Sequence, residues 1–105
     1  MKAKYVLVVA SSPKPGRDAD YAEWYDKVHL PDVCRATGVL NGRRLIALDS
    51  SPATPPGAQI SVFDLDVDDP TSVMAEIMER TKTGDFGSSD AVDPASVKIW
   101  YYRPA

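Results

Sequence analysis

The segment from Trp24 to Asp32 contains the single histidine of the chain and two further side chains that can exchange protons or hydrogen bonds. His29 follows Tyr25 by four residues and precedes Asp32 by three, and these spacings bring the three side chains to one side of a helix. An imidazole that is oriented by a carboxylate is suited to act as a general acid or base. We therefore take His29, Tyr25 and Asp32 as candidate catalytic residues.

Aromatic side chains are frequent around this group and in the strands that we expect to lie beside it. They predict a pocket for a planar, mostly apolar ligand that carries one or two oxygen atoms. A phenol in such a pocket can hold an enolate oxygen while His29 moves the proton. The candidate residues for binding this ligand are Tyr5, Tyr21, Trp24, Val28, Phe63, Phe86 and Trp100.

The same residues also have structural interpretations. His29 can be a packing residue whose ring N–H meets a backbone carbonyl, and Asp32 can cap the turn after Pro31. Aromatic residues in strands often belong to the core or to a subunit interface. The neighbouring Arg43 and Arg44 suit a solvated or ion-paired position on a strand. From the residues alone, these alternatives stay open.

Length and composition limit the class of protein. A chain of 105 residues corresponds to one domain, which we place over residues 1–105. The net charge of −3 argues against nucleic acid or an anionic membrane as a partner. The single cysteine, Cys34, forms no internal disulfide and has no second thiol or histidine with which to hold a metal. We expect a cytoplasmic protein with no metal ion and no other cofactor.

Hydrophobic periodicity predicts four strands and two helices. The strands are expected at 4–10, 39–48, 59–67 and 97–102. One helix is expected from residue 18 to a kink or break at Leu30 before Pro31, with a short second turn running to Gly38, and another over 70–84. Asn41-Gly42 suggests a bulge, 49–58 a loop, and 84–96 a long loop of the kind that often binds ligands. The order βαββαβ predicts an α+β ferredoxin-like plait, in which two helices cover one face of an antiparallel four-stranded sheet.

The first expected strand has apolar residues on both of its sides. Tyr5, Leu7 and Val9 alternate with Val6 and Val8, so both faces of the sheet need to be covered. Helices on one face leave the other face open to water. A homodimer in which two sheets pack face to face would cover it.

Several segments together resemble the EthD-like family of the dimeric α/β-barrel superfamily. They are "YVLVVA", "EWYDKVHLPDV", "GVLNGRRL" and the aromatic last strand, and the resemblance extends over essentially the whole chain. It implies a small cytoplasmic homodimer with a pocket between the helices and the concave side of the sheet. Relatives include cofactor-free lactone isomerases, polyketide cyclases, monooxygenases and haem-binding proteins. A pocket histidine transfers protons in several of them, and His29 matches that position.

Three functional hypotheses follow. The first is a cofactor-independent acid-base enzyme, of isomerase, cyclase or lyase type, that acts on a small hydrophobic oxygenated metabolite. The second is a non-catalytic ligand-binding or accessory protein of a catabolic or biosynthetic pathway. The third is a haem-binding protein, with His29 as axial ligand, or a cofactor-free monooxygenase.

Overall fold

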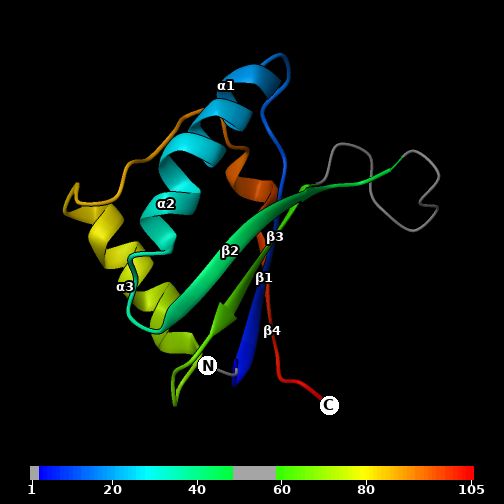
Figure 1. The fold of residues 1–105 in the computed structure, drawn as a ribbon. Helices are drawn as coiled ribbons and strands as arrows, with labels where there is room; N and C mark the ends of the chain where they lie inside the picture. Colours follow the sequence, from blue (N-terminus) through cyan, green and yellow to red (C-terminus); the bar gives the residue numbers. More distant parts are fainter. Residues whose placement is uncertain (1–2, 49–58) are drawn as a thin grey trace.

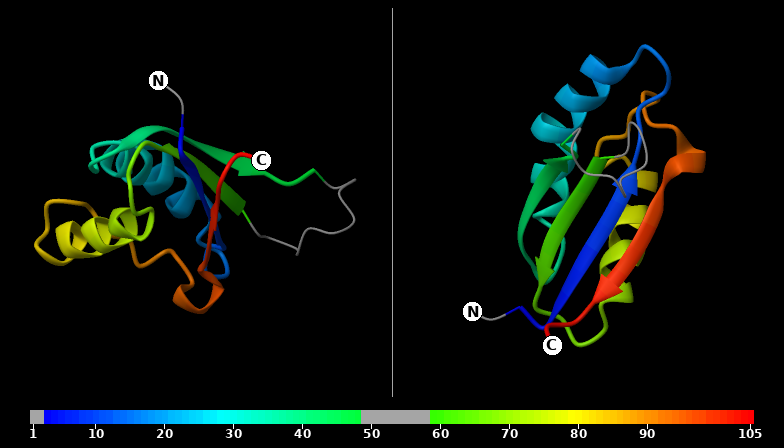
Figure 2. Two further views of the ribbon diagram at one scale, coloured as in Figure 1. Left: turned by 90° about the horizontal axis from the view of Figure 1, so that it is seen from below. Right: turned by 90° about the vertical axis from the view of Figure 1, so that its right-hand side faces the viewer.

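The computed structural model describes residues 3–48 and 59–105 and contains an antiparallel four-stranded sheet with helices on one face (Figure 1; Figure 2). The strands lie side by side in the order β2-β3-β1-β4. The predicted βαββαβ order and the α+β class are confirmed. The expected loop at 49–58 lies outside the described residues. The strands are β1 (Tyr5–Ser11), β2 (Val39–Ile46), β3 (Gln59–Leu65) and β4 (Lys98–Tyr102).

The first helical segment is made of three pieces that follow one another without a break. They are α1 (Asp18–Trp24), a π-helical turn η1 (Tyr25–His29) and α2 (Leu30–Val33). The second helix is α3 (Thr71–Lys82), and a short 3₁₀ turn η2 (Pro94–Ser96) precedes β4. No helix in the described part of the chain is long and apolar enough to cross a membrane.

The chain does not break at Leu30, because the helix runs on through Pro31, but its geometry is irregular just before that residue. The Leu30 N–H bonds to the carbonyl of Tyr25, five residues earlier, which makes this turn wider than an α-helical turn. Pro31 then falls in the first turn of α2, where a missing N–H is tolerated. The wide turn therefore lets the chain pass a proline while staying helical.

The side of the sheet that faces the helices forms the core. Leu7, Phe63 and Leu65 point to this side and pack against Val33 and Val73 from the helices. Side chains alternate along a strand, so the residues between these core positions point to the opposite face of the sheet. Because Val8 pairs with both Val62 and Trp100, these three side chains share that face, and no described segment covers them.

Strand β2 begins irregularly, as the Asn41-Gly42 pair suggested. Its pairing with β3 shifts register between Val39 and Asn41, so the expected bulge or irregular strand start is confirmed. Just before it, Gly38 turns the chain from α2 into β2 with a φ of +84°. The carbonyl of Gly38 accepts the Asp66 N–H at 2.7 Å, which presses this turn against the end of β3.

Replacing Gly38 with alanine should lower the free energy of unfolding by about 2–5 kcal/mol. Left-handed backbone strain contributes about 1–2 kcal/mol of this and overpacking about 1–3 kcal/mol. The added Cβ would lie 2.9 Å from the Asp66 carbonyl oxygen and 2.0 Å from Cγ1 of Val67. Urea denaturation followed by tryptophan fluorescence measures the loss.

Gly16→Ala is the matched control for this substitution. Gly16 has a φ of +75°, and a Cβ there meets no atom within 4 Å. Its loss should be limited to the backbone strain, about 1–2 kcal/mol. Equal losses at Gly16 and Gly38 would show that the close contact with β3 carries no energetic weight.

Candidate functional site

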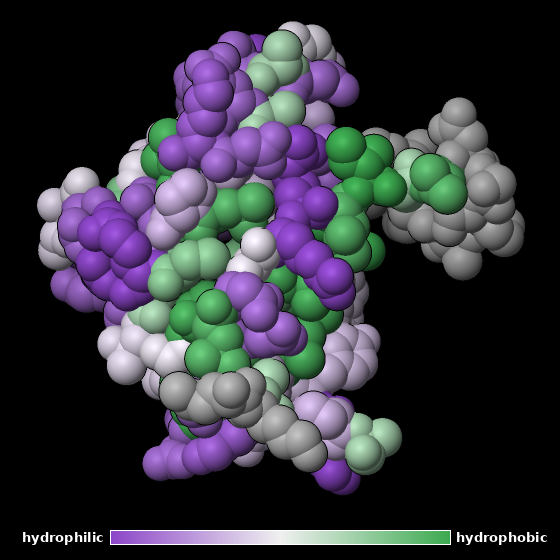
Figure 3. All heavy atoms as spheres, in the orientation of Figure 1, coloured by the Kyte–Doolittle hydropathy of each residue, from purple (hydrophilic) through white to green (hydrophobic). Residues whose placement is uncertain are grey.

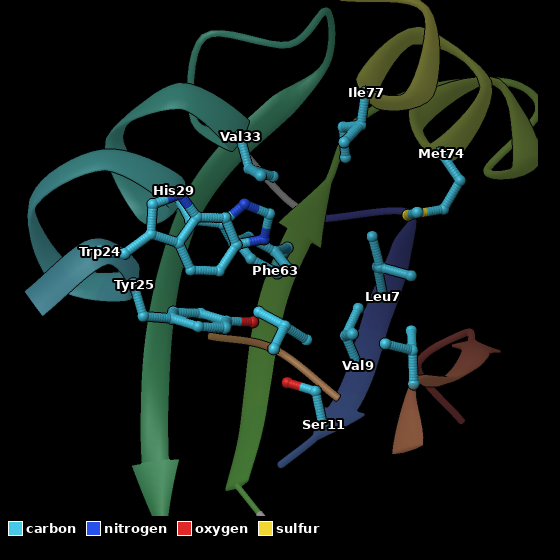
Figure 4. A pocket seen from close by; sticks show the side chains of 12 residues that line it. Leu7, Val9, Ser11, Trp24, Tyr25, His29, Val33, Phe63, Met74 and Ile77 are labelled. Carbon is cyan, nitrogen blue, oxygen red and sulfur yellow. The ribbon is translucent and has the colours of Figure 1, made fainter. Parts of the chain in front are cut away.

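A cavity of about 140 Å³ lies between the helices and the sheet (Figure 4). Leu7 and Val9 of β1 and Phe63 of β3 form its strand side, while Met74 and Ile77 of α3 close it from another direction. Trp24, Tyr25 and His29 project into it from the first helical segment. Four of the residues expected at a ligand pocket, Trp24, Tyr25, His29 and Phe63, are therefore brought together.

The π turn places the indole of Trp24 against the ring of His29. Their ring centroids are 4.6 Å apart and their planes are inclined by 25°, a stacked arrangement. In an α-helix, residues five positions apart lie about 140° apart around the axis and do not stack. In a turn closed by i to i+5 hydrogen bonds, they lie above one another. The stack is thus a direct result of the wide turn.

The imidazole of His29 is desolvated and neutral. Burial lowers its pKa from 6.5 to about 4, and the nearby Asp32 carboxylate only partly opposes this shift. Within the described residues, its ring nitrogens have no hydrogen-bond partner, and no buried side-chain nitrogen or oxygen lacks one. The ring nitrogens therefore border accessible space. A neutral imidazole offers one N–H donor and one lone pair to a ligand.

Tyr25 supplies a phenol at the same cavity. Its ring meets His29 edge to face, with centroids 4.8 Å apart, and its hydroxyl accepts a hydrogen bond from Ser61. Burial, partly offset by that bond, raises the pKa of Tyr25 to about 12. The phenol stays protonated at ordinary pH and acts as a hydrogen-bond donor rather than as a base.

Asp32 does not orient the imidazole as the spacing suggested. One carboxylate oxygen accepts the Gly87 N–H at 2.9 Å, and the other pairs with Arg35 at 3.0 Å. The indole N–H of Trp24 reaches the carbonyl of the same glycine at 3.4 Å. Because its oxygens are engaged in these contacts, Asp32 fastens the loop after α3 to the helix instead of contacting His29.

Five other expected ligand-binding residues lie outside the cavity lining. Tyr21 is fully buried behind Tyr25, at a ring distance of 5.3 Å, and Val28 lies against Gly87. Tyr5 packs on the main core. The remaining two are Phe86 and Trp100.

Phe86 and Trp100 are placed elsewhere for different reasons. The guanidinium groups of Arg35 and Arg80 lie 5.0 and 4.2 Å from the Phe86 ring centroid, so this ring is a wedge between α2 and α3. Trp100 pairs with Val8 and faces away from the helices. Sequence position alone does not say which side of an edge strand with aromatic residues on both sides faces a pocket.

The cavity is also lined by residues that no motif in the sequence indicated. Ser11 is one of them, and the period of two that links Tyr5, Leu7 and Val9 extends to it. Val33, Met74 and Ile77 are the others that matter most, and only the packing of α2 and α3 brings them there. Within 3–48 and 59–105, no group of three or more histidine, cysteine or acidic residues is placed to hold a metal ion.

Comparison with solved structures shows which proteins share this fold. An EthD family protein from Bacillus halodurans matches with a TM-score of 0.58 and 14% identity, over 96% of this chain and 99% of that one. This chain has the fold of an EthD family protein. The predicted resemblance is confirmed at the level of fold. A sequence identity of 14% supports a shared fold and not a shared function.

Two further solved structures are similar in fold to this chain. One is a protein of unknown function from Nitrosomonas europaea, with a TM-score of 0.61 and 16% identity, over 97% of this chain and 89% of that one. The other is a proposed monooxygenase from Shewanella loihica, with a TM-score of 0.54 and 15% identity, over 100% and 98% of the two chains. No protein-family model and no curated protein matches the sequence.

The lowered pKa of the partly buried His29 should make the free energy of unfolding depend on pH between 6.5 and about 4. The folded state binds this proton only near pH 4, whereas the unfolded chain binds it near 6.5. The unfolded state therefore takes up more protons in this window, and acidification destabilises the fold by about 3 kcal/mol. Urea denaturation at a series of pH values and one protein concentration measures this slope.

His29→Gln is the control, because glutamine keeps a polar side chain but does not titrate. The carboxylates titrate in both proteins, so the difference between the two curves isolates His29. Parallel curves from pH 6.5 to 4 would contradict a desolvated imidazole.

Proposed function

We propose that the protein is a cofactor-independent acid-base enzyme, of isomerase, cyclase or lyase type, that acts on a small apolar compound with an oxygen function. The observation that carries this proposal is the neutral imidazole of His29, whose ring nitrogens border a largely apolar cavity without a hydrogen-bond partner among the described residues. A general base must reach the proton that it abstracts, and this imidazole is placed to do so for a ligand in the cavity.

The size of the cavity supports a single-ring ligand. Its volume of about 140 Å³ is close to that of an engineered apolar cavity, roughly 150 Å³, that binds benzene. A haem macrocycle is far larger than this space, so the cavity does not fit a haem with His29 as its axial ligand.

Charge balance explains how an imidazole with a low pKa can take a proton here. Burial disfavours an isolated imidazolium, which is why the pKa of His29 falls to about 4. When the proton comes from a ligand that becomes an enolate, the two charges form together and attract each other strongly in the desolvated site. Tyr25 then donates a hydrogen bond to the enolate oxygen. The imidazolium returns the proton to another carbon.

A second candidate function is ligand binding without turnover. The low pKa of His29 favours it, because an imidazole that stays neutral is a good hydrogen-bond acceptor for a phenol or alcohol. The EthD-like fold also includes a proposed monooxygenase. Oxygen insertion would need molecular oxygen and a substrate that supplies electrons, so proton transfer is the simpler chemistry for these residues.

Proton transfer is tested with cyclohex-3-enone and a β,γ-unsaturated butenolide as single-ring probes. Moving the double bond into conjugation removes one proton and adds one, without any cofactor. His29→Gln should lower kcat/KM by about 100-fold or more, because it removes the general base. Tyr25→Phe should lower it by about 10-fold through the lost donor. Ultraviolet absorbance follows the conjugated product.

Met78→Ala is the control variant, because Met78 is 67% exposed on α3 and does not line the cavity. Its kcat/KM should match that of the unchanged protein. Unchanged turnover in His29→Gln would exclude His29 as the base. Saturable binding of both probes with no turnover in any variant would favour the ligand-binding function instead.

The proposed enzyme acts as a homodimer through the open face of the sheet. Val8, Val62 and Trp100 lie there without cover from the described residues, and Trp100 is 41% exposed. Exposed apolar side chains also gather toward the end of β2 (Figure 3), and of these Leu45, which pairs with Ile60, lies on the open face. A group of exposed apolar side chains of this kind is typical of an interface.

Trp100→Lys should convert the dimer into a monomer, because it buries a charge in the interface. Tyr101→Lys is the matched control. Tyr101 is 38% exposed on the same strand, but it pairs with Leu7 and so belongs to the helix side. Light scattering after size exclusion gives the mass of each variant. Equal effects of the two substitutions, or a monomeric starting protein, would contradict this interface.

A further inference from the structure

One end of the cavity is polar, although the rest of its lining is mostly apolar. The hydroxyl groups of Ser11 and Tyr25 lie near one another beside β1 and β3, while His29 lies farther along, toward Val33 (Figure 4). Both hydroxyl-bearing residues are buried, with exposed fractions of 5% for Ser11 and 3% for Tyr25. Buried hydroxyls at a cavity wall need partners, and a ligand can supply one.

The hydrogen bond from Ser61 leaves the phenolic proton of Tyr25 free for a ligand. Ser61 donates to the Tyr25 oxygen, which therefore acts as acceptor in that bond. Among the described residues, no acceptor receives the Tyr25 proton. Since Ser61 is itself buried, its bond fixes the position of the phenol at the cavity. Tyr25 is thus a preorganised donor that has no competing protein partner.

Ser11 is held in a similar way by Tyr21. The two hydroxyl oxygens are 2.6 Å apart, and either can be the donor. When Tyr21 donates to Ser11, the serine proton is available to a ligand. Two hydroxyl donors, each supported by a buried partner, can then converge on one oxygen atom.

A positive charge lies behind these hydroxyls. Arg44 of β2 has a side chain that is 12% exposed, and it pairs with Asp26 at 2.8 Å. Its charge still acts to lower the pKa of both Tyr21 and Tyr25, against the larger effect of burial. Asp26, the ion-pair partner of Arg44, is half exposed. Solvent therefore screens the negative charge of Asp26 more than it screens the positive charge of Arg44. The field at the hydroxyl end therefore favours negative charge.

We infer that Ser11 and Tyr25 form a subsite for an oxygen with full or partial negative charge, such as the phenolate or enolate oxygen of a single-ring compound. Tyr21 and Ser61 position the two donors, and Arg44 supplies a favourable field. The inference rests on the proposed function, because it places the ligand in the same cavity. It adds a specificity: the ligand presents its anionic oxygen at this end and its acidic proton toward His29.

The test uses 4-nitrophenol, whose phenolate form is coloured, and nitrobenzene, which has the same ring without the hydroxyl. In a cavity that is only apolar, desolvation keeps the bound dye protonated. The proposed subsite has the opposite effect, so bound 4-nitrophenol should contain a larger phenolate fraction than the free dye at the same pH. Absorbance gives this fraction, and quenching of tryptophan fluorescence gives the affinity of each probe.

Ser11→Ala and Tyr25→Phe should each weaken binding of 4-nitrophenolate about 10-fold, since each removes a bond to a charged group. Nitrobenzene affinity should change less than about twofold, which shows that the variants are folded and their cavity is open. Ser12→Ala is the matched control, because Ser12 is the next residue and does not line the cavity. If Tyr25→Phe fails to fold, Ser61→Ala tests the same donor, because it removes the hydrogen bond that positions the Tyr25 hydroxyl.

The inference is overturned if bound 4-nitrophenol is more protonated than the free dye, or if Ser11→Ala binds it as well as Ser12→Ala does. His29→Gln separates this outcome from failure of the proposed function. It should keep the preference for phenolate while losing isomerisation. A protein that binds neither probe would contradict an open cavity and would overturn both proposals together.

Discussion

The stack of Trp24 on His29 is the interaction on which the site depends. It exists because the helix widens to a π turn between Tyr25 and His29, which brings residues five positions apart into register. The indole shields one face of the imidazole from water, while the ring nitrogens are left at the cavity. The same indole reaches the carbonyl of Gly87, so the loop after α3 is tied to the same turn. One local change in helical geometry therefore sets the position of the histidine and of a nearby loop.

Desolvation gives the two reactive groups their roles. It lowers the pKa of His29 and raises that of Tyr25, so both are neutral when the cavity is empty. A neutral acceptor beside a neutral donor favours a reaction in which positive and negative charge form and disappear together. Ser11 extends the donor end, and its partner Tyr21 keeps it in place. The division into an imidazole end and a hydroxyl end defines the orientation of a ligand.

The loop after α3 is held by charged side chains. Asp85 pairs with Arg80 at 2.6 Å and also lies 3.7 Å from Arg35, and Phe86 packs between the two guanidinium groups. Asp32 adds its bond to the Gly87 N–H. These contacts link α2, α3 and the loop. Asp32 thus contributes to the shape of the site without touching a ligand.

The sequence by itself determined the order of the elements, the bulge in β2 and the two apolar sides of β1, because these depend on local periodicity and turn chemistry. It also identified Trp24, Tyr25, His29 and Phe63 as a group, since three of them share one short segment. The tertiary structure decided the rest. It used Asp32 and Phe86 to anchor a loop and turned Trp100 to the open face. It brought Ser11, Met74 and Ile77 to the cavity from distant segments. Such contacts depend on how helices and strands pack in three dimensions, and a local pattern in the sequence does not contain that information.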